Sequence, residues 1–395
     1  MAMRYPTTYP DGCDPAYSYN YTTNNIWYAN TWLMTTLEYQ LVFYGLSIVC
    51  LIGIIGNGSF LFVVGKIKRL HNTTNLYLAS LAMTDITYLI VAFTTTMLFY
   101  LDSPVRHDTM FDSSAGCTLL FATGNFLFYT SLGLVTLVTY ERFRGVCSPF
   151  KHRAISSTGR TKRLIFGTLV TGLALGFLQS LKFAVMTRYC IIWPHLPDFI
   201  GYPQTVEFCL PITTNLNIGL DVLDNVIFII ALLLNGYMYV RIMYTLNNRN
   251  VGLEEDRPTE NTDAPATKAQ TQMQAQTMKI RNQVARMLIM NGAVFFLCQI
   301  SSQINVLDYI LTRTLGTGLY SDAITDTMLI LSRVLIYANS AANPFVYNLS
   351  SSYYRDAYKE AFCGSCIDRF DRNRQMAAMN SAKGPQQVAS VSSRL

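Results

Sequence analysis

Charged and strongly polar residues stand inside long uncharged runs of this 395-residue sequence, where such groups are costly to bury and usually functional. Asp85 stands alone in one run, and Glu141-Arg142-Phe143 closes the next. The last run contains Asn339-Ser-Ala-Ala-Asn343-Pro344-Phe-Val-Tyr347. A carboxylate with amide and hydroxyl oxygens can line a polar cavity, and a proline, which has no N–H, leaves a backbone carbonyl unbonded and weakens its helix. These residues predict ion pairing and a movable joint.

Covalent catalysis has no comparable signal in the sequence. The four histidines are scattered along the chain, and no nucleophile–base pair or metal-ligand spacing is present. We therefore expect no enzyme activity and no organic cofactor.

The uncharged runs predict the elements that carry the polar residues. Only 14% of the residues are charged, against about 25% in soluble domains, and a helix needs roughly 20 apolar residues to cross a bilayer. The uncharged stretch from Tyr39 to Val64 is too long for a soluble helical bundle. We predict an all-α membrane protein, a bundle of seven transmembrane helices within 39–349, with runs near 39–65, 76–101, 117–140, 164–181, 212–240, 287–307 and 323–349.

The basic residues indicate the orientation, because they gather in alternate connections. The connections after the first, third and fifth runs hold most of the lysines and arginines, whereas the other side is acidic. Cytoplasmic loops carry the excess of Lys and Arg, so we expect a multi-pass protein of the plasma membrane with its N-terminus outside and its C-terminus inside. The lipid bilayer is therefore an expected partner of the chain. The net charge of +6 does not indicate a nucleic-acid partner.

The outer side has further features. Residues 1–38 are predicted to be an extracellular tail, and the sequon at Asn20 is a glycosylation site in this topology. Four cysteines lie at the outer side, where disulfides persist. Three pairings of them are open from the sequence alone: Cys13, Cys117, Cys190 and Cys209.

The inner side has features of its own. Residues 350–363 have a helical apolar stripe, which predicts an amphipathic helix on the membrane surface. Cys363 and Cys366 at its end are palmitoylation sites or plain thiols. We expect a disordered cytoplasmic tail over 364–395 and a mostly disordered loop over 247–277.

Together these motifs resemble the rhodopsin-like (class A) G-protein-coupled receptors over about residues 40–365. The matching residues are Gly56-Asn57, Leu81-Ala-Met-Thr-Asp85, Cys117, Glu141-Arg142-Phe143 and Asn343-Pro-x-x-Tyr347. The resemblance implies a receptor that activates a heterotrimeric G protein and is bound by arrestin and receptor kinases. It also implies a disulfide between Cys117 and Cys209.

The resemblance implies roles for individual residues. The G-protein switch would consist of Glu141, Arg142, Phe143, Phe150, Tyr239, Asn343, Pro344 and Tyr347. A sodium ion would be held by Asp85, Ser131, Asn339, Ser340 and Asn343, with a water-filled polar cluster without sodium as the alternative. Gln299 and Ser301 stand where the family usually has Trp and Pro, so its tryptophan toggle does not carry over.

Two ligand classes are set aside by the same resemblance. Tyr337 stands where opsins need a lysine, and Gly124 stands where amine receptors need an aspartate. The long outer loop and the acidic outer face favour a cationic peptide, which the charges would attract at long range. The predicted ligand-binding residues are Asn125, Tyr129, Glu207, Gln299, Gln303, Arg333 and Tyr337. An ion pair of Arg333 with Asp221 or Asp224 is the alternative for that arginine.

The predicted function is therefore a receptor for a small, amidated or cationic neuropeptide. The stretch from Asn75 has a loose similarity to thyrotropin-releasing-hormone and FMRFamide-type receptors. A receptor for a non-peptide small molecule is the first alternative. A seven-helix transporter is the second, although no internal repeat is visible.

Overall fold

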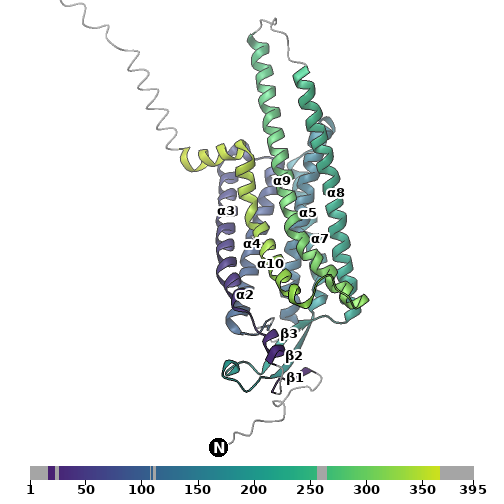
Figure 1. Cartoon of the computed structure of the whole chain (residues 1–395). Helices are drawn as coiled ribbons and strands as arrows, with labels where there is room; N and C mark the ends of the chain where they lie inside the picture. Colours follow the sequence, from purple (N-terminus) through teal and green to yellow (C-terminus); the bar gives the residue numbers. More distant parts are fainter. Residues whose placement is uncertain (1–16, 23–25, 107, 110–112, 256–264, 365–395) are drawn as a thin grey trace, which may run out of the picture.

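The computed structural model describes residues 17–22, 26–106, 108–109, 113–255 and 265–364. Long helices stand side by side in it and form one bundle (Figure 1). In the described part of the chain, six stretches are long and apolar enough to cross a membrane: Thr36–Lys66, Thr73–Phe99, Ser114–Cys147, Thr158–Phe183, Thr214–Asn248 and Met278–Leu315. They belong to the helices α3 (Ser47–Lys66), α4 (Thr73–Asp102), α5 (Ser114–Cys147), α7 (Thr158–Ser180), α8 (Thr214–Glu255) and α9 (Pro265–Leu315).

The seventh helix of the bundle is α10 (Asp322–Ser350). It packs against α9, α3 and α4. It is not among the six stretches above, and it carries polar residues that face the bundle, where Asn339, Ser340 and Asn343 are buried. The predicted all-α bundle of seven transmembrane helices is confirmed, and burial inside the bundle accounts for the polar residues of its last helix.

The helix ends differ from the predicted runs. The first crossing begins at α2 (Thr36–Gln40), where Thr35 caps the helix by accepting a hydrogen bond from Glu38 N at 3.1 Å, and a π-helical turn (Leu41–Leu46) leads into α3. The two helices α8 and α9 extend well beyond the other helices (Figure 1). The predicted disordered loop is therefore helical on both sides of 256–264, since Ala, Gln, Lys and Met favour helices.

A small sheet closes one end of the bundle, called the sheet end below (Figure 1). It consists of β1 (Ser18–Asn20), β2 (Val185–Ile192) and β3 (Thr205–Leu210) in the order β1-β2-β3. The hairpin β2–β3 is antiparallel, and β1 pairs with β2 in parallel. The segment predicted as a tail thus contributes a strand and the short helix α1 (Ile26–Thr31) before α2.

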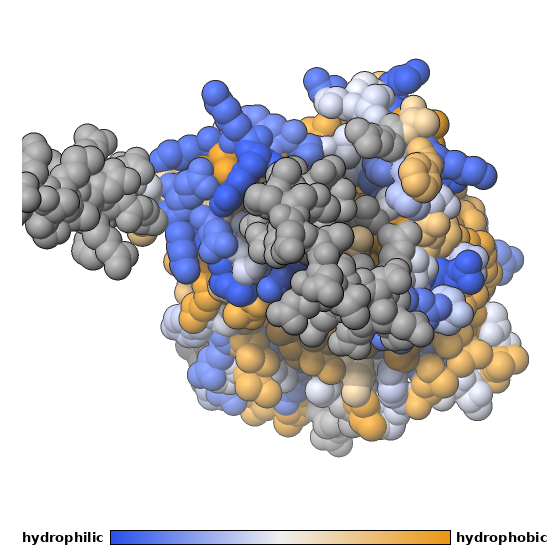
Figure 2. All heavy atoms as spheres, turned by 90° about the horizontal axis from the view of Figure 1, so that it is seen from above, coloured by the Kyte–Doolittle hydropathy of each residue, from blue (hydrophilic) through white to orange (hydrophobic). Residues whose placement is uncertain are grey.

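The opposite end, called the tail end below, carries a helix over residues 352–364. The apolar face of this C-terminal helix is buried through Tyr354, Ala357 and Ala361. The hydroxyl group of Tyr353 donates to the carbonyl oxygen of Arg69 at 2.9 Å, in the turn Lys68–Leu70. Figure 2 views the tail end: hydrophilic residues gather on it and hydrophobic residues form the flanks. The predicted amphipathic helix is present, and Cys366 lies outside the described residues.

Short elements connect the helices. They are α6 (Pro149–Ile155) at the tail end and the 3-10 turns Leu181–Phe183 and Pro197–Phe199 at the sheet end. The main core between the helices contains Phe60, Leu81, Leu134, Phe296 and Tyr347.

Candidate functional site

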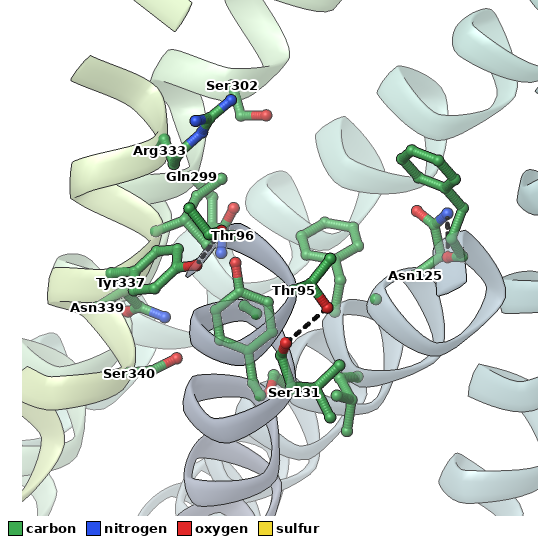
Figure 3. Close-up of a pocket in the computed structure, with 18 of the residues that line it drawn as sticks. Thr95, Thr96, Asn125, Ser131, Gln299, Ser302, Arg333, Tyr337, Asn339 and Ser340 are labelled. Carbon is green, nitrogen blue, oxygen red and sulfur yellow. Dashed lines mark hydrogen bonds between the residues drawn. The ribbon is translucent and has the colours of Figure 1, made fainter. Parts of the chain in front are cut away.

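A cavity of about 420 Å³ lies among four helices of the bundle (Figure 3). Its walls come from α4, α5, α9 and α10, with Phe183 and Asp224 contributed by the neighbouring elements. Five of the predicted ligand residues line it: Asn125, Gln299, Gln303, Arg333 and Tyr337. The spacing of i and i+4 explains the glutamine pair, because residues four apart share one helix face.

Hydrogen bonds hold several wall residues in place. Tyr337 projects from α10, and its hydroxyl oxygen lies 3.1 Å from Thr96 Oγ1 on α4 (Figure 3). The ring of Tyr88 meets that of Tyr337 edge to face at 5.8 Å. Asn125 Nδ2 donates to the carbonyl oxygen of Phe121 at 2.9 Å. The wall between α4 and α10 is therefore aromatic and joined by a hydrogen bond.

Two predicted ligand residues have other surroundings. The hydroxyl group of Tyr129 donates a hydrogen bond to Asp224, so Tyr129 lies behind the wall that Asp224 forms. Glu207 lies on β3, where Arg188 of β2 forms an ion pair with it at 2.7 Å. Glu207 is not among the described residues that line the cavities at this end.

A buried polar network lies at α8. Asp221 and Asp224 were named from the sequence, but the lysine that pairs with one of them was not. Lys182 Nζ donates to Asp221 Oδ1 at 3.0 Å, and both residues are buried. Gln303 Nε2 donates to Asp224 Oδ2 at 3.3 Å. Asp221 therefore pairs with Lys182. In the sequence this pair is indicated only by the position of Lys182, a lone lysine at the end of the fourth uncharged run.

An outer chamber of about 380 Å³ continues the cavity towards the sheet. Both are lined by Thr96, Phe99, Phe121, Phe183 and Arg333, so Arg333 lies at their junction. Glu38 and Arg106 also line the outer chamber, and their side chains form an ion pair at 2.9 Å. Arg106 also pairs with Asp326 of α10 at 2.6 Å.

The disulfide implied by the resemblance is present between Cys117 of α5 and Cys209 of β3. It ties the hairpin to the bundle over a sequence separation of 92 residues. Cys209 and its neighbour Phe208 line the outer chamber. Cys190 of β2 is disulfide-bonded as well, and Cys13 lies outside the described residues.

A polar cluster adjoins the cavity. Asn343 Nδ2 donates to Asp85, and Ser340 hydrogen-bonds to the same carboxylate. Ser131, Asn339 and Ser340 of this cluster also line the cavity. Asn339 Oδ1 is buried without a hydrogen-bond partner. A carboxylate, two hydroxyl groups and an unpartnered amide oxygen are hard oxygen donors, so these residues fit a small monovalent cation.

Pro344 explains how α10 is joined to α3. Because Pro344 has no N–H, the carbonyl oxygen of Ser340 loses its partner within the helix. Asn57 Nδ2 of α3 donates to that oxygen at 2.9 Å. The same amide donates to Gly53 O at 2.9 Å, and Asn57 is fully buried. The proline thus creates an acceptor that an asparagine of the first helix satisfies.

At the tail end, Arg142 lines a cavity of about 300 Å³ with residues of α4, α6, α9 and the C-terminal helix. The buried carboxylate of Glu141 lies 3.7 Å from Arg160 and 3.5 Å from His152, and it accepts from Ser156 at 3.2 Å. Burial lowers the pKa of His152, so that contact is with a neutral ring near pH 7. The expected pair of Glu141 with Arg142 stays a prediction.

The other predicted switch residues surround this end. Tyr239 lies 3.1 Å from Thr139 Oγ1 through its hydroxyl group. Tyr347 is buried against Phe60, with ring centroids 5.0 Å apart. Phe143 packs on the apolar cluster of α5, α8 and α9. Phe150 of α6 is 91% exposed, which suits a docking role better than a core role.

Comparisons with known proteins agree on one family. The family described as 7 transmembrane receptor (rhodopsin family) matches residues 56–347. The Caenorhabditis elegans neuromedin U receptor homolog nmur-2 is 25% identical over 355 residues, covering 82% of this chain and 79% of that protein. The human thyrotropin-releasing hormone receptor is 26% identical over 350 residues, covering 83% and 79%. Human neuromedin-U receptor 1 is 24% identical over 328 residues, covering 82% and 73%.

Proposed function

This chain belongs to the rhodopsin family of seven-transmembrane receptors, and we propose that it binds an extracellular neuropeptide and activates a heterotrimeric G protein at the plasma membrane. Because the family consists of receptors, the transporter alternative is set aside and no enzyme activity is expected. In this proposal the sheet end faces outside with a glycan on Asn20. The C-terminal helix lies at the inner leaflet, anchored by palmitate on Cys363 and Cys366.

The observation that supports a peptide most directly is the two-part cavity at the sheet end. The cavity of about 420 Å³, its deep part and called the deep cavity below, is in the size range of a small-molecule site. The outer chamber extends it towards the hairpin. A peptide terminus can fill the deep part while the rest of the peptide lies in the outer chamber. Relatives at about a quarter identity are receptors for neuromedin U and thyrotropin-releasing hormone, which supports the same class.

Within the deep part, Arg333 is placed to donate to a peptide carbonyl, carboxylate or amide oxygen, because guanidinium N–H groups bind such oxygens in pairs. Gln299, Gln303 and Asn125 add neutral donors and acceptors. Tyr337 shapes the wall through its bond to Thr96. Glu207 lies outside the cavity walls, so its proposed part is to hold the hairpin through Arg188.

The tail end supports the G-protein step of the proposal. Release of Arg142 and docking of Phe150 would complete the G-protein contact. Tyr239 and Tyr347 would support that state, and arrestin and receptor kinases would act at the same face. Sodium, if bound at Asp85, Ser131, Asn339, Ser340 and Asn343, would supply a positive charge that holds the inner helices together in the resting state.

A peptide screen tests this function. Cells that express the chain with a promiscuous G protein are exposed to a neuropeptide library, with untransfected cells and an Arg142→Ala variant beside them. We expect at least one peptide to activate the parent alone, with the variant expressed at the surface and silent. A library without any active peptide contradicts the peptide class, and normal signalling by Arg142→Ala contradicts the switch.

A substitution in the outer chamber distinguishes a peptide ligand from a small-molecule ligand. Met34 lines the outer chamber but not the deep cavity. Met34→Trp fills part of the chamber, so the potency of a peptide should fall about tenfold or more. Unchanged potency would favour the small-molecule alternative.

A further inference from the structure

The deep cavity carries two side chains of opposite charge. Among its described lining residues, Arg333 of α10 and Asp224 of α8 are the charged ones. The helices α8 and α10 both pack against α9, which lies between them. The cavity is therefore a dipolar site, with a cation contributed from one side of α9 and a carboxylate from the other.

The contacts of Asp224 are with neutral donors. One carboxylate oxygen accepts from the hydroxyl group of Tyr129, and the other accepts from Gln303 Nε2 at 3.3 Å. The nearby cation Lys182 forms an ion pair with Asp221, with Nζ 3.0 Å from Oδ1. Each carboxylate oxygen has a further lone pair, so Asp224 has room for another donor.

Such an arrangement is unfavourable for folding alone. Asp224 is 9% exposed, and a buried carboxylate without a cation is strongly destabilised unless a partner is supplied. A Gln or Asn at position 224 would serve Tyr129 and Gln303 equally well without the charge. The negative charge is explained when a bound molecule brings the positive one.

We propose that Asp224 is the counter-ion for a cationic group of the ligand, a terminal amine or a Lys or Arg side chain. The guanidinium group of Arg333 donates to an oxygen of the same ligand, so the ligand is dipolar. This assignment rests on the proposed receptor function for its biological meaning. Tyr129 and Gln303 are then positioning residues, because both donate hydrogen bonds to the Asp224 carboxylate.

Asp224→Asn removes the charge with little change of shape. The Asn oxygen still accepts from Tyr129, and its NH₂ group faces Gln303. Gln303 Oε1 is buried without a partner, so a flip of the Gln303 amide lets it accept from the new NH₂ group. Asp308→Asn is the matched control, because Asp308 is also buried and lines neither cavity. Its Oδ1 accepts from the N–H groups of Leu319 and Tyr320, which an Asn oxygen can also do.

The first experiment measures the charge of the cavity without a ligand. Ser302, a wall residue of α9 (Figure 3), is replaced by cysteine in the purified receptor. Its reaction rates with cationic 2-aminoethyl methanethiosulfonate and neutral methyl methanethiosulfonate are compared, after subtraction of the rates of the Ser302 parent. We expect Asp224→Asn to lower the cationic-to-neutral ratio about fivefold, from the loss of one nearby charge, and Asp308→Asn to leave it unchanged. An equal ratio with and without Asp224 rejects the counter-ion.

The second experiment tests the ligand class with a library of tripeptide amides. Its members differ in two respects: whether the N-terminal amine is free or acetylated, and whether a side chain is basic or neutral. We expect the members that raise the unfolding temperature of the purified receptor to carry a cation, and Asp224→Asn to remove that stabilisation. The inference is rejected if neutral members stabilise equally, if cationic members stabilise Asp224→Asn equally, or if no cationic member stabilises the parent. None of these outcomes depends on G-protein coupling, so they are separate from the signalling test above.

Discussion

The hydroxyl group of Tyr239 on α8 lies where a side chain on residue 292 of α9 would begin: a Cβ added to Gly292 would be 1.6 Å from that oxygen. Only a glycine at this position lets the tyrosine cross α9 and reach Thr139 of α5, at 3.1 Å. Three helices therefore meet at one hydroxyl group near the tail end. A movement of α9 at residue 292 would therefore displace the Tyr239 hydroxyl group and its contact with Thr139.

Gly292→Ala should act through Tyr239. The alanine methyl group displaces the end of the tyrosine side chain, which can rotate away but loses its bond to Thr139, worth about 1 kcal/mol. We expect Gly292→Ala and Tyr239→Phe to change G-protein activation by similar factors, and the double variant to show no further change, as a nucleotide-exchange assay would measure. Gly236→Ala is the control, since nothing lies within 4 Å of its added Cβ. Factors that multiply in the double variant would show that the two residues act independently.

Glu141 and Arg160 should have opposite effects on basal signalling. Arg160 and His152 lie against the Glu141 carboxylate, so they would compete with Arg142 for it if the predicted pair forms. Glu141→Gln weakens any hold on Arg142 and should raise ligand-free nucleotide exchange. Arg160→Gln leaves the carboxylate more available to Arg142 and should lower it. A change in the same direction for both variants would mean that Glu141 acts only on the loop of α6.

Asp85→Asn should remove any sodium dependence of agonist binding. Asp85 is the one acidic residue in the polar cluster with Ser131, Asn339, Ser340 and Asn343, and Asn has nearly the same size. We expect sodium to weaken agonist binding to the parent and to have no effect on the variant, in salt titrations with potassium as the control cation. A parent that responds equally to both cations has a water-filled cluster instead.

The sequence was sufficient for the crossings and for the polar positions inside them. Charge is excluded from lipid-facing helices, so Asp85, Arg142, Arg333 and Asn343 were visible without coordinates. Their neighbours across the bundle were not visible. Lys182 and Asp221 meet through tertiary packing between the end of α7 and α8, and no periodicity in one segment records a partner in another.

Local pattern was also insufficient at three other places in the chain. The strand β1 is three residues long and pairs with β2 from far away in the sequence, so its register comes from β2 rather than from its own residues. The polar stretch from 265 onwards has high helix propensity, and low hydrophobicity alone suggested a loop. Glu207 had the expected charge but lies on a strand whose partner Arg188 neutralises it.

Asn57→Ala should destabilise the receptor more than a typical asparagine change. The substitution leaves Ser340 O, freed by Pro344, without a donor in a fully buried place, at about 1–3 kcal/mol. We expect a clear fall in the unfolding temperature of the detergent-solubilised receptor. Asn225→Ala is the matched control, because its amide donates only to Asp221 O of its own helix. Equal losses for the two variants would show that the bond between α3 and α10 adds no stability.

Arg333→Ala should lower agonist potency by about tenfold or more, which corresponds to about 1.4 kcal/mol. Arg333 lies where the deep cavity meets the outer chamber, so a ligand that occupies both must pass beside its guanidinium group. If the arginine contacts the ligand, the concentration–response curve moves to higher concentration while the maximal response and surface expression are kept. If its role is to hold helices together, the maximal response or the amount of folded receptor falls instead. Arg188→Ala, on the sheet and outside both cavity walls, should leave potency within about twofold, and a loss equal to that of Arg333→Ala would assign the effect to the charge of the whole sheet end.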